Sequence, residues 1–323
     1  MAVASHRLIV RAIQTDTSTP FPEVQVQILR TLLFVPAIRE RMLASARRSG
    51  ADAIVLDLED SVPANEKPAA RRAAANAVSG SAASDQAMFV RLNGIGSSLT
   101  HDDLMAVIAP GLNGVVLPKV ESAQDLRDLD VMIREAEMAN GVRPGDIATV
   151  PIIESARGVL RCEEIARASD RVMALAIGGE DYSRDIGTDR DPAGVGLQHV
   201  RAVVVQVATA YGLLSIDTPY ADYGDERGLI AETRLAKATG LKGKFVIHPD
   251  QIDAVNKVFT PTTAAIAAAR RIIKAYDEGV ASGAGAISVD GRMVDAPIAE
   301  RARALVALAE RAPSSSKKRS ART

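Results

Sequence analysis

The chain has 323 residues, 47% of them hydrophobic, and a formal net charge of −1, so no strong field draws it to nucleic acid or to an anionic membrane. The sequence has no apolar run of about eighteen residues, so we predict no membrane span. The single cysteine, Cys162, excludes an internal disulfide, and one cysteine with only 4 histidines argues against structural zinc. Such low cysteine content is typical of a reducing compartment, so we expect a cytoplasmic protein.

Short apolar segments recur along the chain, and stretches with helical spacing separate them. The segments are residues 30–36, 53–60, 88–93, 114–120, 148–155, 172–178, 214–219 and 244–249. Their nearly continuous apolar character indicates strands that are buried on both faces, as in a parallel sheet. The stretches between them predict helices, the clearest over residues 64–78, 123–140, 200–211 and 226–239.

Strands that alternate with helices in this way predict an α/β fold, a TIM (β/α)₈ barrel. A doubly wound open sheet is the alternative. We expect an N-terminal extension over residues 1–29 and the barrel over residues 30–281. A glycine-rich lid segment with a final helix should follow over 282–312, and the polar, basic residues 313–323 are predicted to be disordered.

Acidic side chains follow two neighbouring strands of the predicted barrel, where active sites of this fold form. Glu154 ends the fifth candidate strand, and Asp181 follows the sixth. Two carboxylates at adjacent strand ends can meet on one cation, and oxygen ligands without Cys or His favour Mg²⁺. The alternative is a pair of salt-bridged acids at the rim of the barrel.

Arg91 lies at the end of the third candidate strand and needs an anionic partner if it is buried. A substrate carboxylate or a developing oxyanion would suit its planar fork, whereas a structural ion pair with Glu59 or Asp60 is the alternative. Lys119 is either a Schiff-base lysine or, as we favour, a charge partner for nearby acids. Further polar residues at strand ends are Asp57, Asn93, Glu121, Glu180, Asp217 and His248.

Several ordered motifs together resemble one family. They are RTLLFVP (30–36), GADAIVLDLEDSV (50–62), VRLN (90–93), LPKVE (117–121), IIESARGV (152–159), IGGEDYSRDIG (177–187), IDTP (216–219) and KFVIHPDQ (244–251). In this order they resemble the citrate lyase β-subunit-like proteins, which include the malyl-CoA and citramalyl-CoA lyases. The resemblance implies a Mg²⁺-dependent aldolase-type lyase that acts on β-hydroxyacyl thioesters of coenzyme A.

The resemblance also implies roles for individual residues. Glu154 and Asp181 match the family's metal ligands, and Arg91 matches its substrate- and enolate-binding arginine. The coenzyme A contacts of the family correspond to Phe34, Arg39, Ile247 and His248. Two departures, Ala37 in place of a usual glycine and Ser45 in place of a frequent lysine, concern the nucleotide end of that ligand.

The C-terminal segment DGRMVDAP (290–297) matches a family motif in which Asp295 corresponds to an aspartate that acts from a neighbouring subunit. The resemblance therefore implies a homo-oligomer, a homotrimer or a multiple of it. A capping role for this aspartate at the following helix is the alternative. Three other functions are also considered: an aldolase of free 2-oxo acids, a citrate lyase β subunit that docks an acyl-carrier protein, and an acyl-CoA thioesterase.

Overall fold

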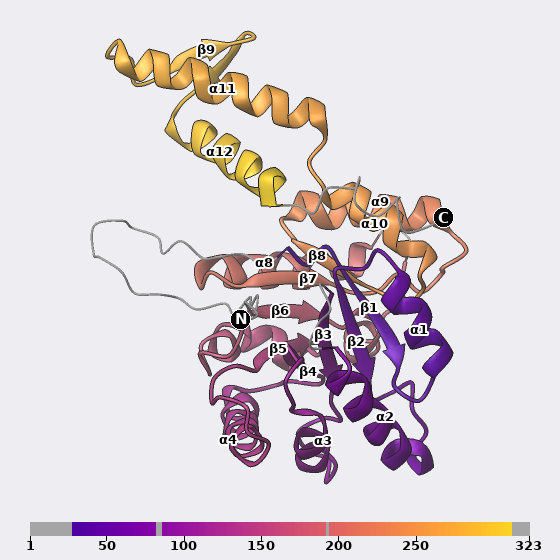
Figure 1. Ribbon diagram of the computed structural model, residues 1–323. Helices are drawn as coiled ribbons and strands as arrows, with labels where there is room; N and C mark the ends of the chain where they lie inside the picture. The colour runs from indigo at the N-terminus through magenta and orange to yellow at the C-terminus, as the bar shows by residue number, and fades with distance from the viewer. Residues whose placement is uncertain (1–27, 82–85, 192–193, 312–323) are drawn as a thin grey trace, which may run out of the picture. The chain divides into compact units, whose positions relative to one another are not determined.

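The computed structural model describes residues 28–81, 86–191 and 194–311. Eight parallel strands form a closed barrel in sequence order, and β1 pairs with both β2 and β8 (Figure 1). The strands are β1 Thr31–Pro36, β2 Ala53–Asp57, β3 Ala87–Arg91, β4 Gly114–Leu117, β5 Ala148–Ile153, β6 Ala174–Ile177, β7 Leu214–Asp217 and β8 Gly243–Val246. The barrel prediction is thus confirmed, and the open-sheet alternative is wrong.

Helices connect successive strands of the barrel. They are α1 Glu40–Arg48, α2 Lys67–Ser79, α3 Thr100–Val107, α4 Ala123–Ala139, α5 Ala156–Leu160, α6 Cys162–Ala166, α7 Gly179–Asp185, α8 Gln198–Ala210 and α9 Glu226–Thr239. After the last strand, β8, comes α10 Asp250–Phe259. Local sequence sets their ends: Ser122 and Asp125 form a capping box at the start of α4, and Gly240 ends α9 with a φ of 119°.

The barrel interior is filled by alternate residues of the strands. Its buried core includes Leu32, Val55, Phe89, Val116, Val150, Ile152, Ala176, Ile216 and Phe245. Because side chains alternate along a strand, the residues two positions after Val55, Phe89 and Ile152 point the same way. These residues are Asp57, Arg91 and Glu154, so strand geometry brings three charged side chains to the carboxyl end of the barrel.

A cluster of four charges is buried in the wall of the barrel. Arg201 of α8 pairs with Asp217 of β7 (Nε–Oδ1 2.9 Å), and Lys244 of β8 contacts both Asp217 (2.7 Å) and Glu232 of α9 (2.8 Å). None of the four side chains is more than 1% exposed. The strand-end prediction for Asp217 is therefore corrected: its neighbour Ile216 fills the barrel interior, and Asp217 pairs with α8 instead.

The chain divides into two compact units, Met1–Asn256 and Lys257–Thr323. The described part of the second unit holds α11 Thr263–Ala281, a hairpin of β9 Ile287–Val289 and β10 Arg292–Val294, and α12 Ala296–Arg311. This boundary lies before α11, which the sequence interpretation counts with the barrel. The predictions for residues 1–27 and 313–323 lie outside the described residues. In the described ranges, we find no helix with the length and apolar character that crossing a bilayer requires.

Local geometry explains the hairpin and the start of α12. Asp290 and Gly291 both have positive φ values, 50° and 76°, as a two-residue hairpin turn requires. Asp295 then caps α12, because its Oδ1 accepts the N–H of Ile298 (3.3 Å) and its carbonyl accepts that of Ala299 (3.0 Å). The capping alternative for Asp295 is therefore present, and its role toward a neighbouring subunit stays a prediction.

Candidate active site

Glu154 follows β5 and lies buried at the mouth of the barrel, 6% exposed. Its Oε1 accepts the peptide N–H of Lys119 (2.5 Å). A methyl group at Gly178 would overlap both Oε2 and the Cβ of Glu154. A glycine at this position thus leaves the space in which the carboxylate sits, and this requirement was not apparent in the sequence.

Lys119 holds two acids at once. Its φ of 56° lies in the left-handed region, and this backbone conformation accompanies the N–H bond to Glu154. Its ammonium Nζ lies 2.5 Å from Oε1 of Glu59 and 3.5 Å from Asp60. Burial lowers the pKa of Lys119, but the Glu59 hydrogen bond and nearby charges, including that of Asp181, outweigh it and raise the pKa. A lysine kept charged suits the charge-partner role, since a Schiff base needs the free amine.

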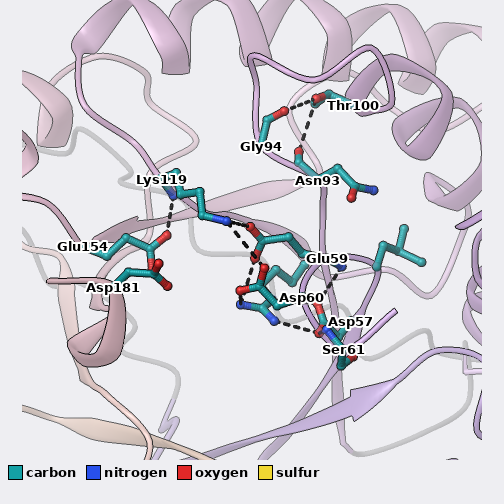
Figure 2. Close-up of polar contacts among 12 residues, drawn as sticks. Asp57, Glu59, Asp60, Ser61, Asn93, Gly94, Thr100, Lys119, Glu154 and Asp181 are labelled. Atoms are coloured by element: carbon teal, nitrogen blue, oxygen red, sulfur yellow. Dashed lines mark hydrogen bonds and ion pairs between the residues drawn. The ribbon is translucent and has the colours of Figure 1, made fainter. Parts of the chain in front are cut away.

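Asp181 lies in the first turn of α7, just beyond β6, and not on the strand itself. Its Oδ1 is 2.6 Å from Nη2 of Arg184. Asp181 and Glu154 line one cavity of about 210 Å³, whose other lining residues are Lys119, Glu121, Ser155, Arg184 and Asp185. Figure 2 shows the two carboxylates side by side. The structure thus brings together the two acids that the sequence singles out.

The two carboxylates disfavour each other's charge. Burial and the negative charge of Asp181 raise the pKa of Glu154 to about 8, against the opposing effects of the Lys119 N–H and Arg91. A cation between the carboxylates would relieve this repulsion. Among the described residues, no group of three or more His, Cys, Asp or Glu side chains could hold a metal. The protein therefore offers two oxygen donors, a set that fits Mg²⁺ because this ion usually keeps several waters.

Arg91, the last residue of β3, is held by a carboxylate that the sequence interpretation did not choose. Its Nε and Nη2 each lie 2.7 Å from an oxygen of Asp57, its register partner on β2. Its Nη1 is 3.0 Å from Glu59 Oε2 and 3.8 Å from Asp60 Oδ2, so the ion pair that was the alternative interpretation is present beside the Asp57 contacts. Burial would raise the pKa of Asp57, but Arg91 outweighs it and lowers that pKa. The shared inward direction and pairing of β2 and β3 could have revealed this partner.

Some of the residues that are predicted to contact coenzyme A lie away from Glu154 and Asp181. Phe34 packs against Phe245 (centroids 4.7 Å apart) and carries the guanidinium of Arg91 over its ring at 4.8 Å. Arg39 is exposed at the start of α1. Ile247 and His248 follow β8, where Nδ1 of His248 accepts the N–H of Asp250 (3.2 Å).

His248 also lines a second cavity of about 430 Å³. The other lining residues are Tyr223, Gly224, Glu226, Leu229, Asp250 and Gln251. The rings of His248 and Tyr223 stack with centroids 5.0 Å apart and an interplanar angle of 18°. None of these residues lines the cavity of Glu154 and Asp181. His248 and the acid pair therefore line separate cavities.

Comparison with known proteins covers most of the chain. The family described as HpcH/HpaI aldolase/citrate lyase matches residues 30–249. The citrate lyase subunit beta of Escherichia coli is 38% identical over 281 residues, 87% of this chain and 93% of that protein. The L-malyl-CoA/beta-methylmalyl-CoA lyase of Rhodobacter capsulatus is 33% identical over 311 residues, 90% of this chain and 98% of its own.

Solved structures agree with this result. The CitE protein of Mycobacterium tuberculosis, in complex with magnesium, acetoacetate and coenzyme A, matches with a TM-score of 0.71 and 33% identity. The match covers 87% of this chain and 98% of that one. The family match over residues 30–249 and the identities to these relatives show that this chain belongs to the HpcH/HpaI aldolase/citrate lyase family.

Proposed function

We propose that the protein is a Mg²⁺-dependent lyase that cleaves or forms the carbon–carbon bond of a β-hydroxyacyl-CoA, such as a malyl-, citramalyl- or citryl-thioester. The observation that carries the proposal is the pair Glu154 and Asp181 on one cavity at the barrel mouth. The named activities of the relatives and the magnesium and coenzyme A of the CitE complex support it. We also propose a cytoplasmic location, since the one cysteine, Cys162, is free and buried.

Glu154 and Asp181 would hold the cation, which would supply positive charge to polarise the substrate oxygen and to stabilise the negative charge that develops in an aldol cleavage. The backbone N–H of Lys119 fixes the carboxylate of Glu154 in place. The ammonium of Lys119 pairs with Glu59 and so keeps the Glu59 carboxylate in a fixed position near the site. The residues around the acid pair are thus ordered before a substrate arrives, as electrostatic catalysis requires.

Arg91 supplies the second positive charge. Loss of the hydroxyl proton breaks the carbon–carbon bond and leaves a thioester enolate, which a fixed guanidinium can stabilise. Asp57 locks the orientation of this guanidinium through two 2.7 Å contacts. We assign the proton transfer to the enolate carbon to Asp295 of a neighbouring subunit, whose segment 282–312 is the lid that excludes water.

The thioester's coenzyme A would contact Phe34, Arg39, Ile247 and His248. Arg39 is an exposed cation at the start of α1, which suits the phosphates of the nucleotide end. Ile247 is 37% exposed and His248 lines the second cavity, so both are accessible to a ligand. The small side chains Ala37 and Ser45 offer no charge to this end of the ligand.

The protein should assemble into a homotrimer, or a multiple of it, with Asp295 acting on a neighbour's barrel. Subunits carrying Glu154→Gln and subunits carrying Asp295→Ala should each be inactive, and unfolding and refolding them together should restore activity. Mixed oligomers then contain intact barrels next to intact lids. If the mixture stays as inactive as its components, each subunit has a self-contained site. Asp290→Asn, in the same hairpin, is the matched control and should retain activity, because asparagine tolerates the positive φ of this turn position.

The affinity for Mg²⁺ should rise with pH and level off near pH 8. Burial and Asp181 raise the pKa of Glu154 to about 8, so at lower pH the cation displaces a proton. The Kd measured by calorimetry should fall about tenfold per unit between about pH 6 and 8. Without Mg²⁺, the folded state keeps a proton that the unfolded state releases near 4.5, so the free energy of unfolding should decrease as pH rises between these values. A Kd that is constant over this range would contradict the prediction.

A substrate screen tests the reaction class. Malyl-, citramalyl- and citryl-CoA, and the same acyl groups on an acyl-carrier protein, are compared with free 4-hydroxy-2-oxo acids. Each is tested with Mg²⁺ and after chelation, and both products are measured. Cleavage of a free hydroxy-oxo acid alone identifies the aldolase alternative, and release of coenzyme A without carbon–carbon cleavage identifies a thioesterase. Activity only with a substrate on an acyl-carrier protein identifies the subunit alternative.

A further inference from the structure

Arg184 of α7 is the most exposed cation in the wall of the acid-pair cavity. Two basic side chains line this cavity, Lys119 and Arg184. The ammonium of Lys119 is held by Glu59 at 2.5 Å, whereas Arg184 is 76% exposed and contacts one carboxylate, that of Asp181, through Nη2 at 2.6 Å. Within the described residues, no other acid lies at ion-pair distance from its guanidinium.

Binding of a divalent cation changes the surroundings of Arg184. Asp181 is one of the two proposed metal ligands, and a cation at its carboxylate competes with Arg184 for the same oxygens and repels the guanidinium. The other acids of the wall already have partners: Glu121 lies 3.4 Å from Arg157, and Asp185 accepts the N–H of Ala156 (2.7 Å). A guanidinium displaced from Asp181 would find no unpaired acid in the wall, so its partners would be water or a substrate anion bound in the cavity.

The charges that line the cavity leave Arg184 as the group on which binding of a second substrate carboxylate depends. Four acids and two bases line the cavity, so a bound divalent cation leaves the wall with no net charge. A second carboxylate on the substrate then gains no general attraction and depends on a direct contact. The planar fork of an arginine matches a carboxylate with two parallel hydrogen bonds.

Building on the proposed function, we propose that Arg184 binds a second carboxylate on the 2-oxo acid portion of the substrate. Thioesters whose cleavage releases a 2-oxo dicarboxylate, such as citryl-CoA, are then preferred over those that release a monocarboxylate, such as malyl- or citramalyl-CoA. The inference assigns Arg184 to substrate specificity, apart from the residues that carry the bond cleavage.

The test compares oxaloacetate with pyruvate, which differ by one carboxylate, as ligands of the Mg²⁺-saturated protein in calorimetry. Arg184→Ala should weaken oxaloacetate binding about ten- to a hundredfold, as expected for a lost hydrogen-bonded ion pair, and leave pyruvate binding nearly unchanged. Arg184→Lys should recover part of the loss. Arg157→Ala is the matched control, because Arg157 is also exposed and contacts Glu121 of the same wall but not Asp181. It should affect both acids little and equally.

A second measurement separates this role from a structural one. With no oxo acid present, Arg184→Ala should bind Mg²⁺ more tightly than the wild type, because a competitor for Asp181 is gone. A variant that merely disturbs α7 would bind Mg²⁺ and both acids more weakly. Equal losses for oxaloacetate and pyruvate, or no loss for either, would overturn the proposal, as would a wild type that does not prefer oxaloacetate.

These outcomes are independent of the proposed function, since binding requires no turnover. A wild type that cleaves thioesters, but whose citryl-to-malyl ratio of kcat/KM is unchanged in Arg184→Ala, contradicts the role of Arg184 alone. A wild type that cleaves no thioester, but binds oxaloacetate through Arg184, contradicts the lyase proposal alone.

Discussion

Glu154→Gln is expected to lower kcat/KM for the thioester by more than about a thousandfold while the barrel stays folded. Glutamine keeps the size that fits beside Gly178 and an oxygen that can accept the N–H of Lys119. It lacks the negative charge that holds the cation. Because the pKa of Glu154 is raised to about 8, the side chain is already neutral in the metal-free protein near pH 7, and the melting temperature should change little.

The control for this prediction is Glu121→Gln. Glu121 lines the same cavity but is half-exposed and pairs with Arg157, so its loss should leave most of the activity and the Mg²⁺ affinity. Steady-state kinetics at several Mg²⁺ concentrations and calorimetric titration measure both variants. If Glu154→Gln kept the wild-type dependence on Mg²⁺, the cation would bind elsewhere.

Arg91→Lys should reduce kcat about a hundredfold and also lower the stability of the protein. Lysine keeps one charge but cannot make the two parallel contacts to Asp57, whose side chain is 2% exposed. The buried carboxylate then lacks part of its hydrogen bonding, which costs about 1–3 kcal/mol. Kinetics and denaturant unfolding of the same samples give the two effects separately.

Asp57→Asn is the matched variant, since it weakens the same contact from the other side and keeps the guanidinium. It should lose a comparable amount of stability but much less activity than Arg91→Lys. If activity instead fell in proportion to stability in both variants, Arg91 would act only as a structural residue. Comparing the two variants therefore separates the catalytic effect of the Arg91 guanidinium from the structural effect of its ion pair with Asp57.

The fold could be predicted because the barrel strands are buried on both faces and leave a strong local pattern. The pattern of apolar residues predicted the ends of the strands less well. Residues 53–60 were predicted as one strand, but β2 ends at Asp57. There the carboxylate accepts the N–H groups of Glu59 (2.9 Å) and Ser61 (3.1 Å) and turns the chain away. A side chain that bonds to the backbone overrides an apolar pattern here.

The sequence predicted which residues belong to the candidate site much better than it predicted which of them contact each other. Glu154 and Asp181 follow adjacent strands, and this order alone brings them together. Side-chain alternation places Asp57 and Arg91 on the inner face of the barrel, but their pairing also depends on the register of β2 with β3, which the apolar segments alone do not specify. The need for glycine at 178 comes from a close approach of two strand ends, and no local pattern records it.

The buried cluster of Arg201, Asp217, Glu232 and Lys244 restricts how this sequence can drift over evolutionary time. It contains two positive and two negative side chains, none more than 1% exposed. Replacing one member leaves a charge without its partner in the interior, at a cost of about 3–5 kcal/mol, which is a large part of the roughly 5–15 kcal/mol that keeps a domain folded. Replacing all four by apolar residues of similar volume carries no such cost. The four positions can therefore be exchanged together but not one at a time, so descendants of this chain should keep the whole cluster or have none of it.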